Sequence, residues 1–272
     1  MLLALGMLAM LLSGCDRHPE KIRLQMKFAA GRQLVYDLNS EQTITINYAE
    51  PVSETSRSQG EMIQKVTVVL PDSSARIAET SSWNFSELGE NGTVEVVSRT
   101  ESLSYRIQPS GRISEFEILA EDDAARWQEY AQSKLEQSQP TFPDQPVAVG
   151  YTWMQTVKIF MPTGEMLDAS TTYRFSELIE VDSRQCAVID YEGNLVLPFD
   201  VMESDSLIRK GVDKVDLTGT IWFDYVNGYV FSQHEVTRVT AERAKILPQK
   251  AKVYTAYIEG ELFFNLKSET IE

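Results

Sequence analysis

The sequence predicts a mainly β protein: an antiparallel half-barrel or pair of curved sheets, made of two related β halves joined by one α-helix. Three observations predict this class. Apolar and polar residues alternate along most of the chain, which is the period of half-buried strands. Turn signals separate these runs, most clearly Asn227-Gly228, which suits a two-residue hairpin with positive φ. Only residues 121–138 show the four-residue spacing of a helix.

Strands are predicted on both sides of that helix. Before it, alternation marks LVYDL, TITINY, MIQKVTVVL and SLSYRIQ, and a turn at 109–111 leads into RISEFEI. In MIQKVTVVL we expect Val66 and Val68 to face the core together, since side chains two residues apart share a face of a strand. After the helix, YTWMQTVKIFM, STTYRFSEL, QCAVIDY and AYIEGELFFNL continue the pattern. The abundance of Thr, Val, Ile and Tyr is typical of pleated surfaces.

The helix has its own start and stop signals. Trp127, Ala131 and Leu135 lie four residues apart, so they fall along one side of a helix. The acidic residues at 121–123 favour a helix start, because negative charge is stabilised near the first turn. Two prolines follow shortly after residue 138 and end the segment.

The N-terminus predicts an export signal. The run MLLALGMLAMLLSG has no charged residue and is too short for a membrane-spanning helix, which needs about 20 apolar residues. Leu-Ser-Gly-Cys at 12–15 resembles the bacterial lipoprotein signal at all four positions. That resemblance implies cleavage before Cys15, a diacylglycerol thioether on its sulfur and acylation of the new amino group. We therefore expect an envelope protein that is anchored by this lipid and faces the periplasm. Asp16 resembles the enterobacterial signal for inner-membrane retention, although the choice of membrane stays open.

The expected organisation has five parts: a signal peptide at 1–14, a lipidated tether at 15–27, a first β half at 28–118, a helix and linker at 119–141, and a second β half at 142–272. Both halves contain a middle strand that ends in Phe-Ser-Glu-Leu, in SSWNFSEL and TTYRFSEL. Each half also opens on a glycine before a strand and contains a long hairpin whose return begins at a glycine. This shared order indicates a duplicated β unit. The alternative is that meanders look similar because they share turn chemistry.

One segment carries a family resemblance. FPDQPVAVGYTW, at 142–153, resembles the linker of an uncharacterised family of bacterial lipoproteins, in which Phe-Pro, Pro-Val and Gly-x-x-Trp precede the second β half. The overall plan is similar to the curved-sheet lipoproteins of the LolA/LolB type, in which an antiparallel sheet wraps around a helix. The first resemblance implies no known reaction. The second implies a hydrophobic cavity for acyl chains, without assigning ligand contacts to residues of this chain.

Residue types that support catalysis are scarce. His234 shares a strand face with Ser232 about 7 Å away, and no nucleophile elbow is present. Cys186 lies in an apolar run with no neighbouring cation, so we expect a buried apolar residue rather than a reactive thiol. The chain lacks a zinc ligand set and a Gly-rich phosphate loop. We therefore expect no enzymatic activity, no metal and no cofactor.

Charge and aromatic content narrow the function. A net charge of −15 disfavours nucleic acid and anionic membrane surfaces as partners. Aromatic side chains mostly form cores, but those on a concave sheet can also contact a ligand. We assign Trp127, Trp153 and Trp222 to such a ligand-binding wall, with Trp127 facing one of the other two across the concavity.

The expected function is therefore binding of a hydrophobic ligand or lipid by an anchored protein. An assembly or adaptor lipoprotein that binds a protein partner is the alternative. An envelope hydrolase, with acids converging on His234, is a more distant one.

Overall fold

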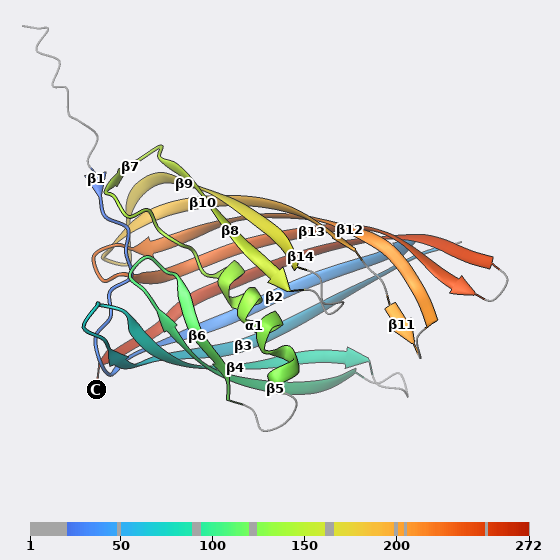
Figure 1. The fold of residues 1–272 in the computed structure, drawn as a ribbon, viewed down its shortest axis with the longest axis horizontal. Helices are drawn as coiled ribbons and strands as arrows, with labels where there is room; N and C mark the ends of the chain where they lie inside the picture. The colour runs from blue at the N-terminus through green and yellow to red at the C-terminus, as the bar shows by residue number, and fades with distance from the viewer. Residues whose placement is uncertain are drawn as a thin grey trace, which may run out of the picture.

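The computed structural model describes residues 21–47, 50–88, 94–119, 124–160, 166–198, 201–203, 206–247 and 250–271. Within these residues, the chain forms a large antiparallel sheet, a small two-stranded sheet and one α-helix (Figure 1). The predicted fold class is confirmed. The predicted signal peptide and Cys15 lie outside the described residues. No helix in the described part of the chain is both long and apolar enough to cross a bilayer.

The strands alternate with short turns along almost the whole chain. In order they are β1 (Lys21–Ile22), β2 (Arg32–Asn47), β3 (Pro51–Val69), β4 (Ala75–Leu88), β5 (Val94–Ile107), β6 (Ile113–Ile118), β7 (Val147–Ala148), β8 (Thr152–Phe160), β9 (Met166–Val181), β10 (Arg184–Pro198), β11 (Val201–Glu203), β12 (Ser206–Asp224), β13 (Tyr229–Leu247) and β14 (Lys250–Ile271). The helix, α1, spans Ala124–Ser138, within the predicted range.

The strands before and after α1 form one continuous curved sheet, not two separate sheets. Its order is β6-β5-β4-β3-β2-β14-β13-β12-β10-β9-β8, with β11 paired to β12. The two halves meet where β2 pairs with β14, from Asn47↔Thr255 to Arg32↔Ile271. β6 and β8 are the two edges, so the sheet curves without closing into a barrel, and α1 lies on its concave side (Figure 1).

The helix bridges the gap between the two edge strands. On β8, the Gln155 side-chain amide donates to the carbonyl oxygens of Glu136, at 2.9 Å, and Gln139, at 3.2 Å. Carbonyls at a helix C-terminus lack partners within the helix, so Gln155 satisfies groups that would otherwise be unpaired. On β6, the carbonyl oxygen of Phe116 accepts a hydrogen bond from Gln128 of α1 at 3.0 Å. These side chains fix α1 across the opening of the half-barrel.

The tether prediction is wrong for residues 21–27. β1 pairs with β7, and Leu24 and Met26 are 1% and 7% exposed within the main core. The Met26 backbone amide also donates to the carbonyl oxygen of Pro109 at 2.7 Å. The reason is periodicity: Ile22, Leu24 and Met26 alternate with polar residues, so an extended segment buries all three on one side.

A β-bulge corrects the predicted face of Val68. The β3–β4 register shifts between Val66 and Val68, and Val68 is 45% exposed whereas Val66 is 5% exposed. An extra residue in one strand changes which face the following side chains occupy.

The hairpin predicted at Asn227-Gly228 is present, but its turn is longer than expected. It comprises residues 225–228, and of the predicted pair only Gly228 has positive φ. The Asp224 carboxylate accepts the backbone amides of Val226, at 3.1 Å, and Asn227, at 2.8 Å. This Asx-type arrangement stabilises a four-residue loop in place of the tight two-residue turn.

Candidate ligand cavity

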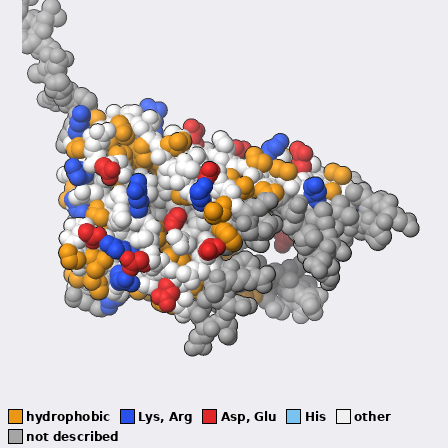
Figure 2. All heavy atoms as spheres, viewed as in Figure 1, with side chains coloured by type: hydrophobic (Ala, Val, Ile, Leu, Met, Phe, Trp, Pro, Cys, Tyr) orange, Lys and Arg blue, Asp and Glu red, His pale blue; other side chains and the backbone are white. Residues whose placement is uncertain are grey.

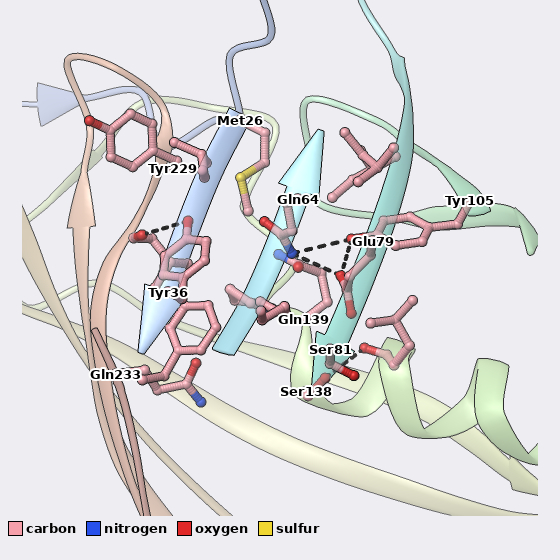
Figure 3. A pocket seen from close by; sticks show the side chains of 18 of the residues that line it. Met26, Tyr36, Gln64, Glu79, Ser81, Tyr105, Ser138, Gln139, Tyr229 and Gln233 are labelled. Carbon is pink, nitrogen blue, oxygen red and sulfur yellow. Dashed lines mark hydrogen bonds between the residues drawn. The ribbon is translucent and has the colours of Figure 1, made fainter. Parts of the chain in front are cut away.

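A cavity of about 320 Å³ lies on the concave face, between the sheet and the C-terminal end of α1 (Figure 3). It is lined from the N-terminal segment, β2 to β5, the end of α1, β13 and β14. The lining residues are Met26, Lys27, Phe28, Arg32, Leu34, Tyr36, Leu38, Met62, Gln64, Val66, Ile77, Glu79, Ser81, Trp83, Tyr105, Ile107, Leu135, Ser138, Gln139, Pro140, Gly228, Tyr229, Val230, Gln233, Glu235, Leu262 and Phe264. The wall therefore combines many apolar side chains with a few polar ones, which is the usual composition of a small-molecule pocket.

Aromatic side chains form one wall where the two sheet halves meet. Tyr36 on β2 stacks on Phe264 of β14, with ring centroids 4.1 Å apart. The Tyr36 hydroxyl donates to the carbonyl oxygen of Val230 at 3.1 Å, and the residue is only 1% exposed. Burial raises the pKa of Tyr36, so its phenol stays neutral. This wall is buried, largely apolar and uncharged.

The first sheet half places a buried acid in the cavity wall. The Tyr105 hydroxyl donates to Glu79 Oε2 at 2.8 Å, and Gln64 Nε2 donates to the same oxygen at 3.0 Å (Figure 3). Glu79 is 6% exposed, and within the described part of the chain no cation forms an ion pair with it. Burial raises the pKa of Glu79, and the hydrogen bonds from Gln64 and Tyr105 offset only part of that rise.

The second sheet half places the same residue types on the facing part of the sheet. The Tyr191 hydroxyl donates to Glu235 Oε2 at 2.9 Å and accepts from Gln233 Nε2 at 2.8 Å. Tyr191 reaches β13 across β12, where a Cβ on Gly219 would overlap the tyrosine ring. Burial raises the pKa of Glu235, while the hydrogen bonds from Tyr191 and Thr237 and the charge of Lys134 on α1 act in the opposite direction.

The two cations that line the cavity are held by other groups. Lys27 Nζ donates to the carbonyl oxygens of Tyr225, at 3.2 Å, and Val226, at 2.8 Å. Arg32 donates to the carbonyl oxygen of Lys27 at 2.9 Å and pairs with Glu269 at 3.3 Å. Both side chains fasten the 225–228 loop and the N-terminal segment to the sheet.

Among the described residues that line the cavity, two buried donors make no hydrogen bond: Gln139 Nε2 and Arg32 Nε, of which Arg32 Nε lies 3.3 Å from Glu269 Oε1 in an ion pair. Gln139 Nε2 is inaccessible to solvent and makes no hydrogen bond with the described residues. Figure 3 shows its side chain extending from the end of α1 towards Gln64 and Glu79. An unpaired buried amide costs about 1–3 kcal/mol, so an acceptor on a bound molecule would be stabilising here.

The predicted tryptophan wall is not the wall of this cavity. Trp153 is on the concave face, where its indole donates to the carbonyl oxygen of Thr141 at 2.7 Å and stacks on Tyr173, but it does not line the cavity. Trp222 lies between Ile221 and Phe223, which are both in the concave core, so strand alternation places it on the convex face. The assignment of Trp222 to the concave wall is therefore wrong. The side chain of Trp127 lies outside the described residues.

Sequence reasoning missed Glu79, Glu235 and their tyrosines. A signal for Glu79 exists: in ARIAETSSW it occupies the inward register of β4, between Ile77 and Ser81. An acid at an apolar position of a strand marks either a compensated core site or a ligand site.

The residues that the sequence offers as candidates for catalysis, Ser232, His234 and Cys186, do not line the cavity. Ser232 donates to Asn265 Oδ1 at 2.6 Å, and His234 stacks on Phe263 with ring centroids 4.4 Å apart. Both point away from Gln233 and Glu235, and hence away from the cavity. Cys186 is fully buried, as expected, and burial raises its pKa to about 11. Within the residues that can be described, no three His, Cys, Asp or Glu side chains are grouped to hold a metal ion.

Comparison with known proteins gives remote structural likenesses. No protein-family model matches the chain, and no curated protein matches it in sequence. The linker resemblance to a lipoprotein family therefore stays a prediction. Similar solved structures include lipovitellin, which is 12% identical over 90% of this chain with a TM-score of 0.43; the chain spans 26% of the lipovitellin chain.

Two bacterial structures are also similar. An exported protein with a YmcC-like fold from Bacteroides fragilis is 9% identical, over 91% of this chain and 99% of that one, with a TM-score of 0.25. An outer-membrane lipoprotein-sorting protein domain from Vibrio parahaemolyticus is 9% identical, over 87% of this chain and 85% of that one, with a TM-score of 0.14. Likeness at these TM-scores establishes neither family nor activity, so the chemistry of the site rests on its own residues.

Proposed function

We propose that this chain is a lipid-anchored protein of the bacterial cell envelope that binds a hydrophobic small molecule in the cavity of its concave sheet, without catalysing a reaction on it. The observation that carries the proposal is the cavity itself. Its volume of about 320 Å³ lies at the lower end of the range of ligand pockets, about 300–1,000 Å³. A cavity of this size suits one aliphatic chain or one small ring system rather than a lipid with several chains.

The lining supports reversible binding. The stacked pair Tyr36 and Phe264 provides an apolar wall that is already in place, so little side-chain ordering opposes binding. The unpaired donor on Gln139 and the acid Glu79 provide two polar contacts that can orient the ligand. Gln155, by fixing α1 to β8, keeps the cavity covered.

The proposal also includes the location of the protein at a membrane and its lack of catalytic activity. Acylation at Cys15 would hold the folded domain at a membrane surface, close to hydrophobic ligands. Ser232 and His234 are bonded or stacked on the side away from the cavity, which supports a binding role over hydrolysis. Glu79 and Glu235 lie in the cavity wall but contact neutral donors rather than a nucleophile.

Native mass spectrometry tests the proposal. A secreted chain that begins at Asp16 contains every described residue, so it retains the complete fold described above. After purification without detergent, we expect a bound species with the mass of a single-chain hydrophobic molecule. A Leu38→Trp variant, which adds volume to the cavity wall, is expected to lose that species, whereas Val253→Trp on the exposed surface is expected to keep it. A chain without bound mass that also takes up no added aliphatic ligand would contradict the proposal.

The adaptor alternative has weaker support. A protein-binding surface is expected to gather exposed apolar side chains into one patch. The exposed apolar residues Val52, Met154, Val196 and Val253 lie on four strands, β3, β8, β10 and β14, and β14 also carries Tyr257, Phe263 and Ile271. In the face shown in Figure 2, acidic and basic side chains are interspersed among small apolar groups.

A further inference from the structure

We propose that the ligand of the cavity carries a basic nitrogen: it is a single-chain amphiphilic amine whose ammonium group pairs with Glu79. This inference rests on the proposed function and names the chemical class of its ligand. It is carried by the charges of the cavity wall and by its aromatic composition.

Glu79 supplies an acid without a counter-charge. Its hydrogen-bond partners, Gln64 and Tyr105, are neutral, and both donate to Oε2. The charged side chain that acts on the pKa of Glu79 is Glu101, which is also acidic and raises that pKa. A buried carboxylate without a cation is costly, and a charge-assisted hydrogen bond from an ammonium is among the strongest that can stabilise it.

The cavity offers little to an anionic headgroup. Lys27 and Arg32 are the cations in its lining, and each is engaged by backbone carbonyl oxygens of the N-terminal segment or the 225–228 loop. Glu235 adds a second acid to the wall, and the whole chain carries a net charge of −15. Arg32 Nε makes no hydrogen bond but already forms an ion pair with Glu269 at 3.3 Å, so a carboxylate or phosphate would compete with Glu269 for it in a field of its own sign.

The aromatic rings around the cavity also favour a cation. Phe28, Tyr36, Trp83, Tyr105, Tyr229 and Phe264 all line it. The negative face of an aromatic ring attracts ammonium groups, and rings combined with an acid are the usual recognition site for organic cations. The aliphatic chain of the ligand would contact the remaining wall, which includes Leu34, Met62 and Val66.

Three ligands with the same chain separate the headgroup from the hydrophobic contribution. Dodecylamine, dodecanol and dodecanoate would be titrated calorimetrically into the chain beginning at Asp16, below the micelle concentration of each. We expect dodecylamine to bind about tenfold more tightly than dodecanol, a difference of about 1.4 kcal/mol, because hydrogen bonds to charged groups are stronger than those to neutral ones. Dodecanoate is expected to bind most weakly.

Matched variants identify the group responsible. Glu79→Gln keeps the shape of the side chain and one acceptor oxygen for Gln64 and Tyr105 but removes the charge, so it is expected to abolish the preference for the amine and to leave dodecanol affinity within about twofold. Glu192→Gln removes the same formal charge from an exposed position of β10 outside the cavity lining and is expected to leave the preference intact.

The outcomes distinguish the two proposals. Equal or tighter binding of dodecanol, or an amine preference that survives Glu79→Gln, overturns the amine inference while the hydrophobic-ligand proposal stands. Failure of all three ligands to bind overturns both.

Discussion

The two halves of the sheet build the same kind of hydrogen-bond network, from a glutamate, a tyrosine and a glutamine, but they surround the glutamate differently. Glu79 bonds to side chains of the adjacent strands β3 and β5, is 6% exposed and has no cation partner. Glu235 is only partly buried, receives its tyrosine from a strand two places away, and lies within the field of Lys134 on α1.

This difference separates a structural role from a binding role. Tyr191 and Glu235 connect β10 to β13 across β12, and the charge of α1 helps to compensate the acid. Glu79 is compensated by neutral donors alone, so a cationic ligand stabilises it more than it stabilises Glu235. The residue types are the same, and burial with the distribution of neighbouring charge decides what each network does.

Gly219→Ala is expected to have the largest effect on stability, because it disrupts the hydrogen bond between Tyr191 and Glu235 and leaves the Glu79 network unchanged. The added methyl group overlaps Tyr191 and comes within 2.6 Å of the His234 carbonyl oxygen, so Tyr191 must move off Glu235. We expect the free energy of unfolding to fall by about 3 kcal/mol, from overpacking and the lost hydrogen bond. Urea denaturation measures this.

Gly260→Ala is its control, because the nearest atom to the added methyl group there is 4.0 Å away. It is expected to change stability by about 0.5 kcal/mol or less. Equal losses of unfolding free energy in Gly219→Ala and Gly260→Ala would show that stability does not depend on the space beside Tyr191.

Removing the tyrosine hydroxyls compares the networks directly. Tyr105→Phe leaves the buried Glu79 with one donor, Gln64, and is expected to cost about 2 kcal/mol. Tyr191→Phe is expected to cost about 1 kcal/mol, since Glu235 is more accessible and stays close to the Thr237 hydroxyl. Both values come from urea unfolding at neutral pH, and the reverse order would contradict the assignment of Glu79 as the less compensated acid.

The pH dependence of stability sharpens the comparison further. The pKa of each glutamate is raised in the folded state above its ordinary value of 4.5, so the folded chain retains protons that the unfolded chain has lost. Their contribution to stability is complete below pH 4.5 and is lost as the pH rises through the folded-state pKa.

Each protonated group accounts for a slope of at most about 1.4 kcal/mol per pH unit in this range. We expect Glu79→Gln to flatten the decline in unfolding free energy above pH 4.5 more than Glu235→Gln does. Urea unfolding at a series of pH values measures the slopes, and identical slopes in wild type and Glu79→Gln would mean that Glu79 titrates normally.

The smallest expected effect concerns Lys134. Its charge lowers the pKa of Glu235, so Lys134→Met is expected to raise that pKa and to leave the pKa of Glu79 unchanged. Carbon-detected NMR titration of the two side-chain carboxyl groups measures both values in one sample. Equal shifts of the two groups would remove the distinction between their surroundings.

The sequence predicted the elements well because their signals are local. The strand alternation, the helix ending at Ser138 and the hairpin around Gly228 each depend on a few neighbouring residues. The prediction of a tether was wrong for residues 21–27. A short alternating segment beside a polar stretch cannot be distinguished from a tether until the core that buries Leu24 is known.

The site was less accessible to prediction because it depends on long-range register. Tyr36 meets Phe264 only because β2 pairs with β14, a pairing between segments more than 200 residues apart that no local pattern specifies. The face of Trp222 was predicted wrongly for the same reason. A large ring favours burial, but the β10–β12 register pairs Trp222 with Val188 and places the ring on the convex face.

A crystal structure with an ω-brominated dodecylamine tests the central claim most directly, because the anomalous signal of bromine locates the chain without reference to any assumed pose. The account predicts one bromine peak inside the cavity, beside the apolar wall that contains Tyr36 and Phe264, with the nitrogen within hydrogen-bond distance of Glu79. Bromine found only on the convex face, or an empty cavity in crystals that contain the ligand, would contradict it.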